Sequence, residues 1–386
     1  MKKWQKILVM SVSYILAVAV GGILTFVLFL RSDSGFDKLK QLHMLIDSRF
    51  VGNLDQERLF DGAAAGMVAG TGDRWSYYIS ASDMAAFNQQ RDNQFVGVGV
   101  TIAMREDEKG ADILRVEPDS PAQKAGVLAG DILHMVDGAL VAELGMEATS
   151  ERIGGKIGTQ VKLTVLRGEE TLELTATRDT IRLAVAQGQM LSGNIGYVRI
   201  ANFNANCAKE TIAQIDALVE QGAVGLVFDV RYNGGGYVTE LVKILDYLLP
   251  EGKLFVSQYY NGETTVDSSD AKCLELPMVV LVNESSYSAA EFFPAALREY
   301  EWAQVVGTPT VGKGYFQETY YFADGSAVAL SVGKYFTPNG VSLADAGGLV
   351  PDVVVEVDPE TDAAIYSRTL PLEEDPQLQA ALELLP

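Results

Sequence analysis

The segment NESSYSAAEFF, residues 283–293, follows the apolar run Met278–Val282 and places three serines at a predicted strand-to-helix junction. A serine hydroxyl becomes a nucleophile when a nearby base accepts its proton. The two histidines of the chain, His43 and His134, are far from this segment in the sequence. A base other than histidine is therefore required, and a neutral lysine can serve instead.

Lys313 is the candidate for that base. It lies between two glycines in TPTVGKGYFQ, with Val311, Tyr315 and Phe316 as apolar neighbours. A free lysine has a pKa near 10.4, and desolvation can lower it towards ~7–8, where the amine accepts protons near neutral pH. The sequence thus offers a serine and a lysine with complementary chemistry.

Two alternatives compete with a catalytic serine. Ser288 and Glu291 fit a capping box, in which the serine hydroxyl is committed to the helix backbone. Pro294 removes a hydrogen bond from the following helix, so we expect that helix to be distorted or to start late. The other alternative is a cysteine enzyme using Cys207 or Cys273, although neither residue has a credible histidine partner.

Composition excludes some classes of protein. The chain has 386 residues, with 51 acidic and 30 basic side chains and a formal net charge of −21. Nucleic-acid binding needs clustered basic residues and is not expected. Two cysteines and two histidines, far apart in the sequence, do not match the ligand spacing of a structural zinc site, and no metal or cofactor is expected. Whether Cys207 and Cys273 pair is left open, with a buried free thiol favoured for each.

The N-terminus predicts a membrane anchor. MKKWQK carries three lysines, and the next 24 residues, Ile7–Leu30, have no charge. About 20 apolar residues span a bilayer as a helix, and this run is longer than that of a cleaved signal peptide. By the positive-inside rule we expect a single-pass protein of the cell membrane, with residues 1–31 as cytoplasmic tip and anchor and the remainder extracytoplasmic.

The remaining chain divides by its hydrophobic period. Residues 32–90 form a helical N-terminal segment with no catalytic character, and residues 91–180 read as a small α+β module. Residues 181–358 alternate strands and helices, which predicts a βαβ core with a largely parallel sheet. RYNGGG and NESSYS both follow buried strands of that core, where active sites of parallel sheets lie. Residues 359–386 are a C-terminal extension.

The stretch DSPAQKAGVLAGDILHMVDG resembles a PDZ domain of the kind found in bacterial proteases. That resemblance implies that the loop Val96, Gly97, Val98 and Gly99 offers backbone N–H groups to a terminal carboxylate. It also implies that the next strand receives the peptide by β-addition. A plain hairpin bulge is the simpler alternative for the glycines.

The segments NESSYSAAEFF, VGTPTVGKGYFQ and LVFDVRYNGGG together resemble the carboxy-terminal processing peptidases, or tail-specific proteases. The resemblance implies Ser288 as nucleophile, Lys313, 25 residues later, as base, and Gln317 as the residue that orients Lys313. It also implies oxyanion donors at Ala289 and Gly235. Glu291 is expected to be structural. Gly234 stands where the family has proline, which leaves the choice of glycine open.

We therefore expect an α/β plus α+β multidomain protein with an N-terminal transmembrane helix, a helical segment, a PDZ domain and a βαβ protease core. The expected function is a serine endopeptidase that binds accessible apolar C-termini of proteins and peptides through the PDZ domain. The rival function is a catalytically inactive PDZ adaptor at the membrane. The N-terminal helices fit a homodimer and intramolecular packing equally well.

Overall fold

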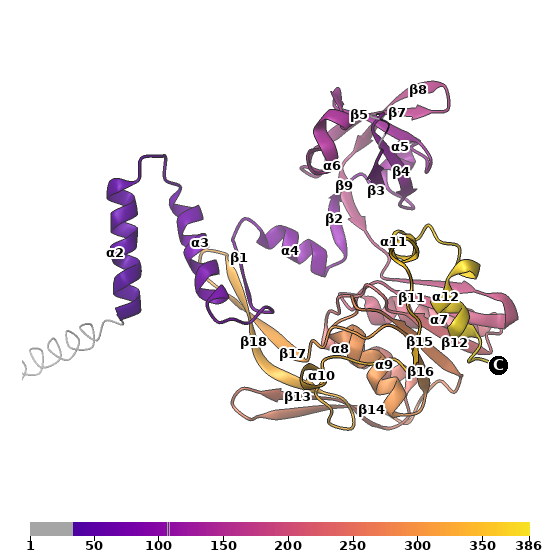
Figure 1. Cartoon of the computed structure of the whole chain (residues 1–386). Helices are drawn as coiled ribbons and strands as arrows, with labels where there is room; N and C mark the ends of the chain where they lie inside the picture. Colours follow the sequence, from indigo (N-terminus) through magenta and orange to yellow (C-terminus); the bar gives the residue numbers. More distant parts are fainter. Residues whose placement is uncertain (1–33, 106, 108) are drawn as a thin grey trace, which may run out of the picture. The chain divides into compact units, whose positions relative to one another are not determined.

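The computed structural model describes residues 34–105, 107 and 109–386 (Figure 1). These residues fall into two units that divide between Met67 and Val68. The predicted membrane anchor, residues 7–30, lies outside the described residues. Within the described part of the chain, no helix has both the length and the apolar character needed to cross a bilayer.

Two helices form the first unit, as the spacing of apolar residues predicted. They are α2, Ser34–Arg49, and α3, Gln56–Ala69, whose last residues pass into the second unit. The His43 ring packs against Phe60 with ring centroids 5.0 Å apart, and Gln56 hydrogen-bonds both His43 and Asp47. The two helices are therefore paired by a small polar and aromatic contact.

The segment 32–90 is not helical throughout, which corrects the expectation from sequence. After α3 the chain forms a short strand, β1, Tyr77–Ile79, and then the helix α4, Met84–Arg91. β1 pairs antiparallel with Ala327–Ala329, about 250 residues further along the chain. Because its partner is so remote in sequence, no local period marks this strand.

The described residues of the α+β module expected from the sequence form eight strands and two helices. Its main sheet has the order β3-β4-β5-β7-β8, with β6 on β5 and a separate β2–β9 ladder. Ser120 caps the short helix α5 by accepting from the Gln123 amide, and Gly126 ends it at φ +90°. The elements are β2 Gln94–Gly97, β3 Val100–Met104, β4 Ala111–Val116, α5 Pro121–Ala125, β5 Ile132–Val136, β6 Ala139–Leu140, α6 Val141–Ile153, β7 Gln160–Arg167, β8 Glu170–Thr177 and β9 Asp179–Arg182.

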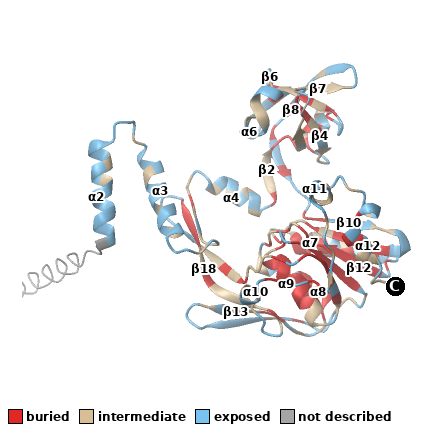
Figure 2. Ribbon diagram, in the orientation of Figure 1, coloured by how far each residue is buried: buried red, intermediate tan, exposed pale blue. Residues whose placement is uncertain are grey.

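The core from residue 186 onward contains a six-stranded sheet of order β10-β11-β12-β15-β16-β19, parallel except for β10. The largely parallel sheet predicted from sequence is confirmed. The central strands β12 and β15 are buried at every position, which explains their unbroken apolar sequences (Figure 2). The strands are β10 Ala186–Met190, β11 Ile195–Ile200, β12 Gly225–Asp229, β15 Met278–Val282, β16 Ala303–Gly307 and β19 Val353–Val354.

Helices cover both faces of this sheet. One face carries Ile200, Phe228 and Val280 and packs in a single apolar cluster with helices α7, α8 and α9. The opposite face packs on the C-terminal helix α12 through Leu378 and Ala381. The helices are α7 Cys207–Glu220, α8 Val238–Leu248, α9 Ala289–Glu299, α10 Leu343–Ala346, α11 Pro359–Ser367 and α12 Pro376–Leu382, with 3-10 turns at Ser192–Asn194 and Leu372–Glu374.

A second, antiparallel sheet was not predicted. It has the order β1-β18-β13-β14, and β17 also pairs with β18. Its strands come from three distant parts of the chain: β1, then β13 Gly252–Tyr259 and β14 Thr264–Ser269, then β17 Tyr315–Tyr321 and β18 Ala327–Phe336. β17 starts two residues after Lys313, so this sheet fixes one side of the candidate site.

Candidate active site

Ser288 lies at the sharp turn between β15 and α9, at the carboxyl end of a central strand. Its φ and ψ are +60° and −125°, a conformation that residues with a Cβ rarely adopt. Such backbone strain persists only where surrounding contacts impose it, and strained strand-to-helix turns present nucleophilic serines in other hydrolases. The Ser288 side chain is mostly buried and borders the cleft described below.

The helix α9 begins at Ala289, immediately after Ser288, so the expectation of a late start is wrong. Pro294 lies inside this helix and has no N–H, so the carbonyl of Ala290 has no backbone donor from that position. The helix nevertheless continues on both sides of Pro294. The Ser288 N–H donates to the Glu291 carboxylate at 2.9 Å, and the Glu291 N–H donates to the Ser288 backbone carbonyl at 2.8 Å. The backbone of Ser288 therefore accounts for both of these capping contacts.

The other serines of the segment have different surroundings. Ser286 is fully buried, and its hydroxyl donates to the Val230 carbonyl at 2.8 Å while it accepts from the Asn283 N–H. Ser285 is used through its backbone, since its N–H donates to Asn283. Ser286 thus ties the turn to the neighbouring strand end, and Ser288 alone of the three borders the cleft.

Glu291 connects the serine turn to the lysine loop. Its fully buried carboxylate accepts from the backbone N–H groups of Ser288, Gly312 and Lys313 at 2.7–2.9 Å and from the Thr310 hydroxyl. The structural role expected for Glu291 is thus explicit. It fixes the two chemically important segments against each other, a task that helix capping alone does not describe.

Lys313 reaches the same cleft from the loop before β17. Its Nζ lies 4.7 Å from the centroid of the Trp75 ring and 5.7 Å from that of Tyr287, and these two rings stack on each other. Burial lowers the pKa of Lys313 to about 8, against the opposing effect of the Asp73 and Glu291 charges. At neutral pH a larger fraction of Lys313 is therefore uncharged than of a solvent-exposed lysine.

Trp75 is a site residue that the sequence reasoning missed. It comes from the turn before β1, in the segment expected to have no catalytic character, and the Arg74 guanidinium carbon lies 4.1 Å from the centroid of its ring. The aromatic cluster RWSYY was the only sign in the sequence of a role for Trp75, and aromatic clusters of this kind usually pack in a protein core. The long-range pairing of β1 with β18 is what brings Trp75 to the cleft.

Ser288, Lys313 and Gln317 line one cleft of about 880 Å³. Among the residues described, no hydrogen bond joins the Ser288 hydroxyl to the Lys313 Nζ, which instead lies beside the aromatic rings. The Gln317 side-chain N–H donates to the Ser331 hydroxyl at 3.0 Å and to the Tyr315 carbonyl at 3.3 Å. The three predicted residues are brought to one cleft, whereas the predicted contact of Gln317 with Lys313 is not formed here.

The two predicted oxyanion donors are neighbours. Ala289 is the first residue of α9, so its N–H belongs to the unpaired first turn of a helix. Gly235 has φ +83°, and a Cβ there would lie 2.8 Å from the Ser288 Cβ and 3.0 Å from the Ala289 nitrogen. The Gly235 N–H donates to the Asn233 side chain at 2.8 Å. A Cβ at Gly234, such as proline carries, would lie 2.6 Å from the Tyr287 hydroxyl.

The predicted carboxylate loop of the α+β module is shorter than expected. Val96 and Gly97 belong to β2 and pair with Thr180 and Asp179. Only Val98 and Gly99 form the turn into β3, with Val98 fully buried and Gly99 at φ +82°. β3 is an edge strand of its sheet, so one side of it has no partner strand within the described part of the module.

The cysteines lie elsewhere. Both are free, and burial raises the pKa of the Cys207 thiol to about 12, which keeps it protonated. Cys273 lines a separate cavity of about 650 Å³. His134 bonds to the Lys109 carbonyl in the α+β module. Across residues 34–105, 107 and 109–386, no three His, Cys, Asp or Glu side chains gather as ligands of a metal ion would.

Three parts of the chain match known families. Residues 194–355 match Peptidase family S41, residues 96–177 match the PDZ domain, and residues 29–83 match the "Activating protease CtpB N-terminal domain". The α+β module is thus a PDZ domain. The cleft with Ser288 and Lys313 lies largely in the S41 region, with Trp75 contributed by the N-terminal one.

Whole-chain relatives agree. "Carboxy-terminal processing protease CtpA" of Bacillus subtilis (strain 168) is 34% identical over 330 residues, covering 84% of this chain and 70% of the relative. A "Probable CtpA-like serine protease" of Staphylococcus epidermidis is 29% identical over 367 residues, covering 92% and 74%.

Solved structures give the same result. The photosystem II D1 C-terminal processing protease matches with a TM-score of 0.50 at 29% identity, covering 88% of this chain and 92% of that one. A putative S41 protease from Bacteroides fragilis shares the fold with a TM-score of 0.56 at 20% identity, covering 87% and 92%. The chain belongs to the carboxy-terminal processing proteases of peptidase family S41, serine proteases that here carry a PDZ domain.

Proposed function

We propose that the chain is a membrane-anchored, extracytoplasmic endopeptidase in which Ser288 is the nucleophile and Lys313 the general base. The observation that carries the catalytic part is the pairing of a strained serine turn with a buried lysine, whose pKa is lowered to about 8, in one cleft. A lysine with that pKa is a competent proton acceptor near neutral pH.

The proposed reaction is acyl transfer in two steps. Neutral Lys313 removes the Ser288 proton as Oγ bonds to the substrate carbonyl carbon. The tetrahedral adduct then collapses, the peptide C–N bond breaks, and the lysine proton passes to the leaving amine. Water attacks the resulting ester with Lys313 again as base, which releases the acid and restores the serine.

In the proposed mechanism Lys313 moves from the Trp75 ring towards Ser288, since no hydrogen bond joins the two side chains in the described part of the structure. Its flexible side chain allows this movement without change in the loop that Glu291 holds. In this proposal Gln317 steadies the moved amine through its side-chain oxygen, because its nitrogen already donates to Ser331. Substrate that enters the cleft would compete with the lysine for the aromatic surface.

The Ala289 and Gly235 amides are the proposed oxyanion donors. Both border the Ser288 side chain, and a helix N-terminus favours negative charge. An oxyanion would have to take the Gly235 N–H from Asn233, its present acceptor. Gly235→Ala should abolish turnover, because its Cβ would meet Ser288 and its φ is unfavourable for alanine.

The proposed substrates are proteins with accessible apolar C-termini. The unpartnered edge of β3 can accept such a tail as an added strand, with the terminal carboxylate at the turn formed by Val98 and Gly99.

The proposed location follows from the uncharged run Ile7–Leu30 behind three lysines. The full chain should resist alkaline extraction from membranes, and its protease core should be digested by protease added to spheroplasts. Extraction of the full chain by alkali, or protection of the core until the membrane is lysed, would contradict this location.

The first unit offers a surface for a homodimer. Several large apolar side chains on and around its helices are more than half exposed: Phe36, Leu42, Met44, Leu45, Phe50, Phe60 and Met67. We propose that these side chains form a joint apolar surface, and exposed apolar surface of that kind marks interaction sites. Light scattering in detergent should give a dimer that Leu42→Asp with Leu45→Asp converts to a monomer, and a monomeric wild type would refute the proposal.

The decisive test compares wild type, Ser288→Ala and Lys313→Ala, each as the full chain in mild detergent, on an unfolded protein such as casein. Both variants should fold and lose cleavage, and a serine-directed phosphonate should label wild type but not Ser288→Ala. Cleavage by Ser288→Ala would overturn the mechanism. The wild type could instead bind a tail peptide yet be neither labelled by the phosphonate nor able to cleave casein, whether or not the tail peptide is present. That result would favour an inactive PDZ adaptor.

A further inference from the structure

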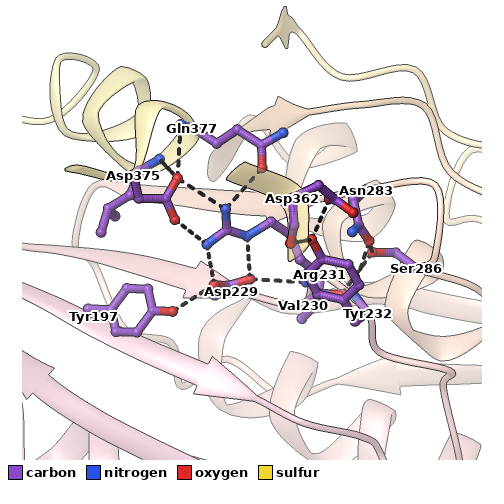
Figure 3. A network of polar contacts seen from close by, with 11 residues as sticks. Tyr197, Asp229, Val230, Arg231, Tyr232, Asn283, Ser286, Asp362, Asp375 and Gln377 are labelled. Atoms are coloured by element: carbon purple, nitrogen blue, oxygen red, sulfur yellow. Dashed lines mark hydrogen bonds and ion pairs between the residues drawn. The ribbon is translucent and has the colours of Figure 1, made fainter. Parts of the chain in front are cut away.

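A buried polar network joins the C-terminal segment, residues 359–386, to the strand end that precedes the Gly235 loop (Figure 3). At its centre is Arg231, whose guanidinium donates twice to Asp229, at 3.0 and 2.6 Å. The same group donates twice to Asp375, at 3.2 and 2.7 Å, and once to Gln377, at 2.9 Å. All five guanidinium N–H groups therefore have acceptors.

The electrostatics of this network are strong because it excludes water. Burial alone would raise the pKa of Asp229, but the charge and hydrogen bonds of Arg231 outweigh it, so that pKa lies below its ordinary value. The Tyr197 hydroxyl also donates to Asp229 at 2.6 Å. Arg231, Asp229, Asp375 and Gln377 are all at least 97% buried.

Tyr232, the next residue, makes a second link. Its hydroxyl donates to the Asp362 carboxylate, and its ring packs edge-on against Tyr366 of α11 at 5.2 Å. Its φ is +58°, which is unfavourable for a residue with a Cβ. Two consecutive residues of this strand end are thus held by α11 and α12.

The same strand end is hydrogen-bonded to the serine turn. The Tyr232 N–H donates to the Asn283 side chain at 2.9 Å, and the Val230 carbonyl accepts from the Ser286 hydroxyl at 2.8 Å. The Asn233 carbonyl accepts from the Tyr287 N–H at 3.1 Å, one residue before Ser288. A shift of Arg231 or Tyr232 would therefore be transmitted to Ser288 and to the Gly235 amide.

Simple attachment of the C-terminal segment does not require this network. Leu378 and Ala381 already pack against the sheet, and apolar side chains in place of a buried ion pair often stabilise a protein as well or better. Bidentate, charge-assisted hydrogen bonds add a fixed relative orientation of the groups that they join. That geometry is maintained directly behind the proposed oxyanion donor.

We propose that the C-terminal segment is a positioning element for catalysis, acting through the Asp375–Arg231 pair and the Asp362–Tyr232 hydrogen bond on the loop that carries Gly235. The inference rests on the proposed function of Ser288 and Gly235. Neither α11 nor α12 contributes a residue to the cleft. The segment therefore acts through Arg231 and Tyr232 and touches no reacting atom.

The test uses a pair of matched helix caps in the full chain. Asp375 caps α12 and Asp358 caps α11, each followed by proline and each accepting from two backbone amides. Asparagine caps nearly as well as aspartate. In Asp375→Asn, however, the amide NH₂ is left facing the Arg231 guanidinium, donor against donor, whereas Asp358→Asn leaves the Arg231 network intact.

We expect Asp375→Asn to lower kcat about tenfold with KM within about twofold of wild type, since a displaced oxyanion donor weakens transition-state binding. Asp358→Asn should keep both constants. Two measurements correct kcat for unfolded enzyme. Circular dichroism at the assay temperature gives the folded fraction, and titration with a phosphonate gives the number of active sites. A corrected kcat for Asp375→Asn within twofold of wild type would overturn the inference.

A second pair serves if Asp375→Asn does not fold. Tyr232→Phe removes only the hydroxyl that bonds Asp362, and Tyr366→Phe is its control on the opposing ring. Tyr232→Phe should lower kcat several-fold and Tyr366→Phe should not; equal kcat values would reject the positioning role. Ser288→Ala, assayed in parallel, separates the proposed mechanism from the proposed role of the C-terminal segment. If Ser288→Ala still cleaves substrate, the mechanism is refuted, whatever the cap variants do.

Discussion

At the scale of single residues, the state of Lys313 should control the pH dependence. Burial holds the pKa of its amine at about 8, so only about one tenth is neutral at pH 7. Deprotonation creates the base, so kcat/KM should rise with pH through about 8 and level off above it. Initial rates on a fluorogenic peptide between pH 5.5 and 10 would show this limb. A flat profile, or a rise centred near 10.4, would count against Lys313 as the base.

Glu291 gives a second residue-scale prediction. Glu291→Gln replaces one acceptor oxygen by an NH₂ group facing N–H donors that the carboxylate now satisfies. We expect a loss of about 3 kcal/mol in unfolding free energy, because buried donors are left unpaired, and a kcat at least about a hundredfold lower. Urea unfolding and peptide assays measure the two effects. Glu284→Gln, at an exposed glutamate that accepts from Thr308, is the control and should change neither the unfolding free energy nor kcat.

At the scale of secondary structure, the strand β1 matters because it brings Trp75 over Lys313. Trp75→Ala would admit water to the lysine, and the loss of desolvation should raise its pKa. The limb of the pH–rate profile should then move to higher pH by about one unit, while Trp75→Phe, which keeps a ring, should move it less. A limb that stays in place, or moves to lower pH, would mean that Trp75 is not what desolvates the lysine.

At the scale of the whole molecule, the PDZ domain should select ends of chains. A peptide with an apolar C-terminus should bind and be cleaved when linked to an unstructured segment. The same peptide with an amidated C-terminus lacks the carboxylate that the Val98–Gly99 turn would bind, and should bind at least about tenfold more weakly. Fluorescence anisotropy compares the two, and equal affinities would show that the terminal carboxylate is not recognised.

Much of this molecule was predictable because its signals are local. The apolar runs of β12 and β15, the helix α5 with its Ser120 cap and glycine stop, and the spacing of Ser288 to Lys313 all lie within short windows of sequence. The parallel sheet then follows from alternation of strands and helices. Two boundaries differ from expectation. The PDZ turn is shorter because Val96 and Gly97 pair with β9, and α9 starts at once because Ser288 caps it. Each change concerns one or two residues, and sequence patterns do not define element ends that finely.

The residues that carry the proposed chemistry can be read directly from the sequence: a serine after a buried strand, a lysine between glycines, a glycine loop at a second strand end, and an uncharged N-terminal run. The surroundings of those groups depend on long-range packing, which short windows of sequence do not encode. Trp75 meets Lys313 through a strand pair about 250 residues apart, and Asp375 meets Arg231 across 144 residues. Such contacts depend on how remote segments pack together, and pairing over that distance leaves no periodic mark in the sequence.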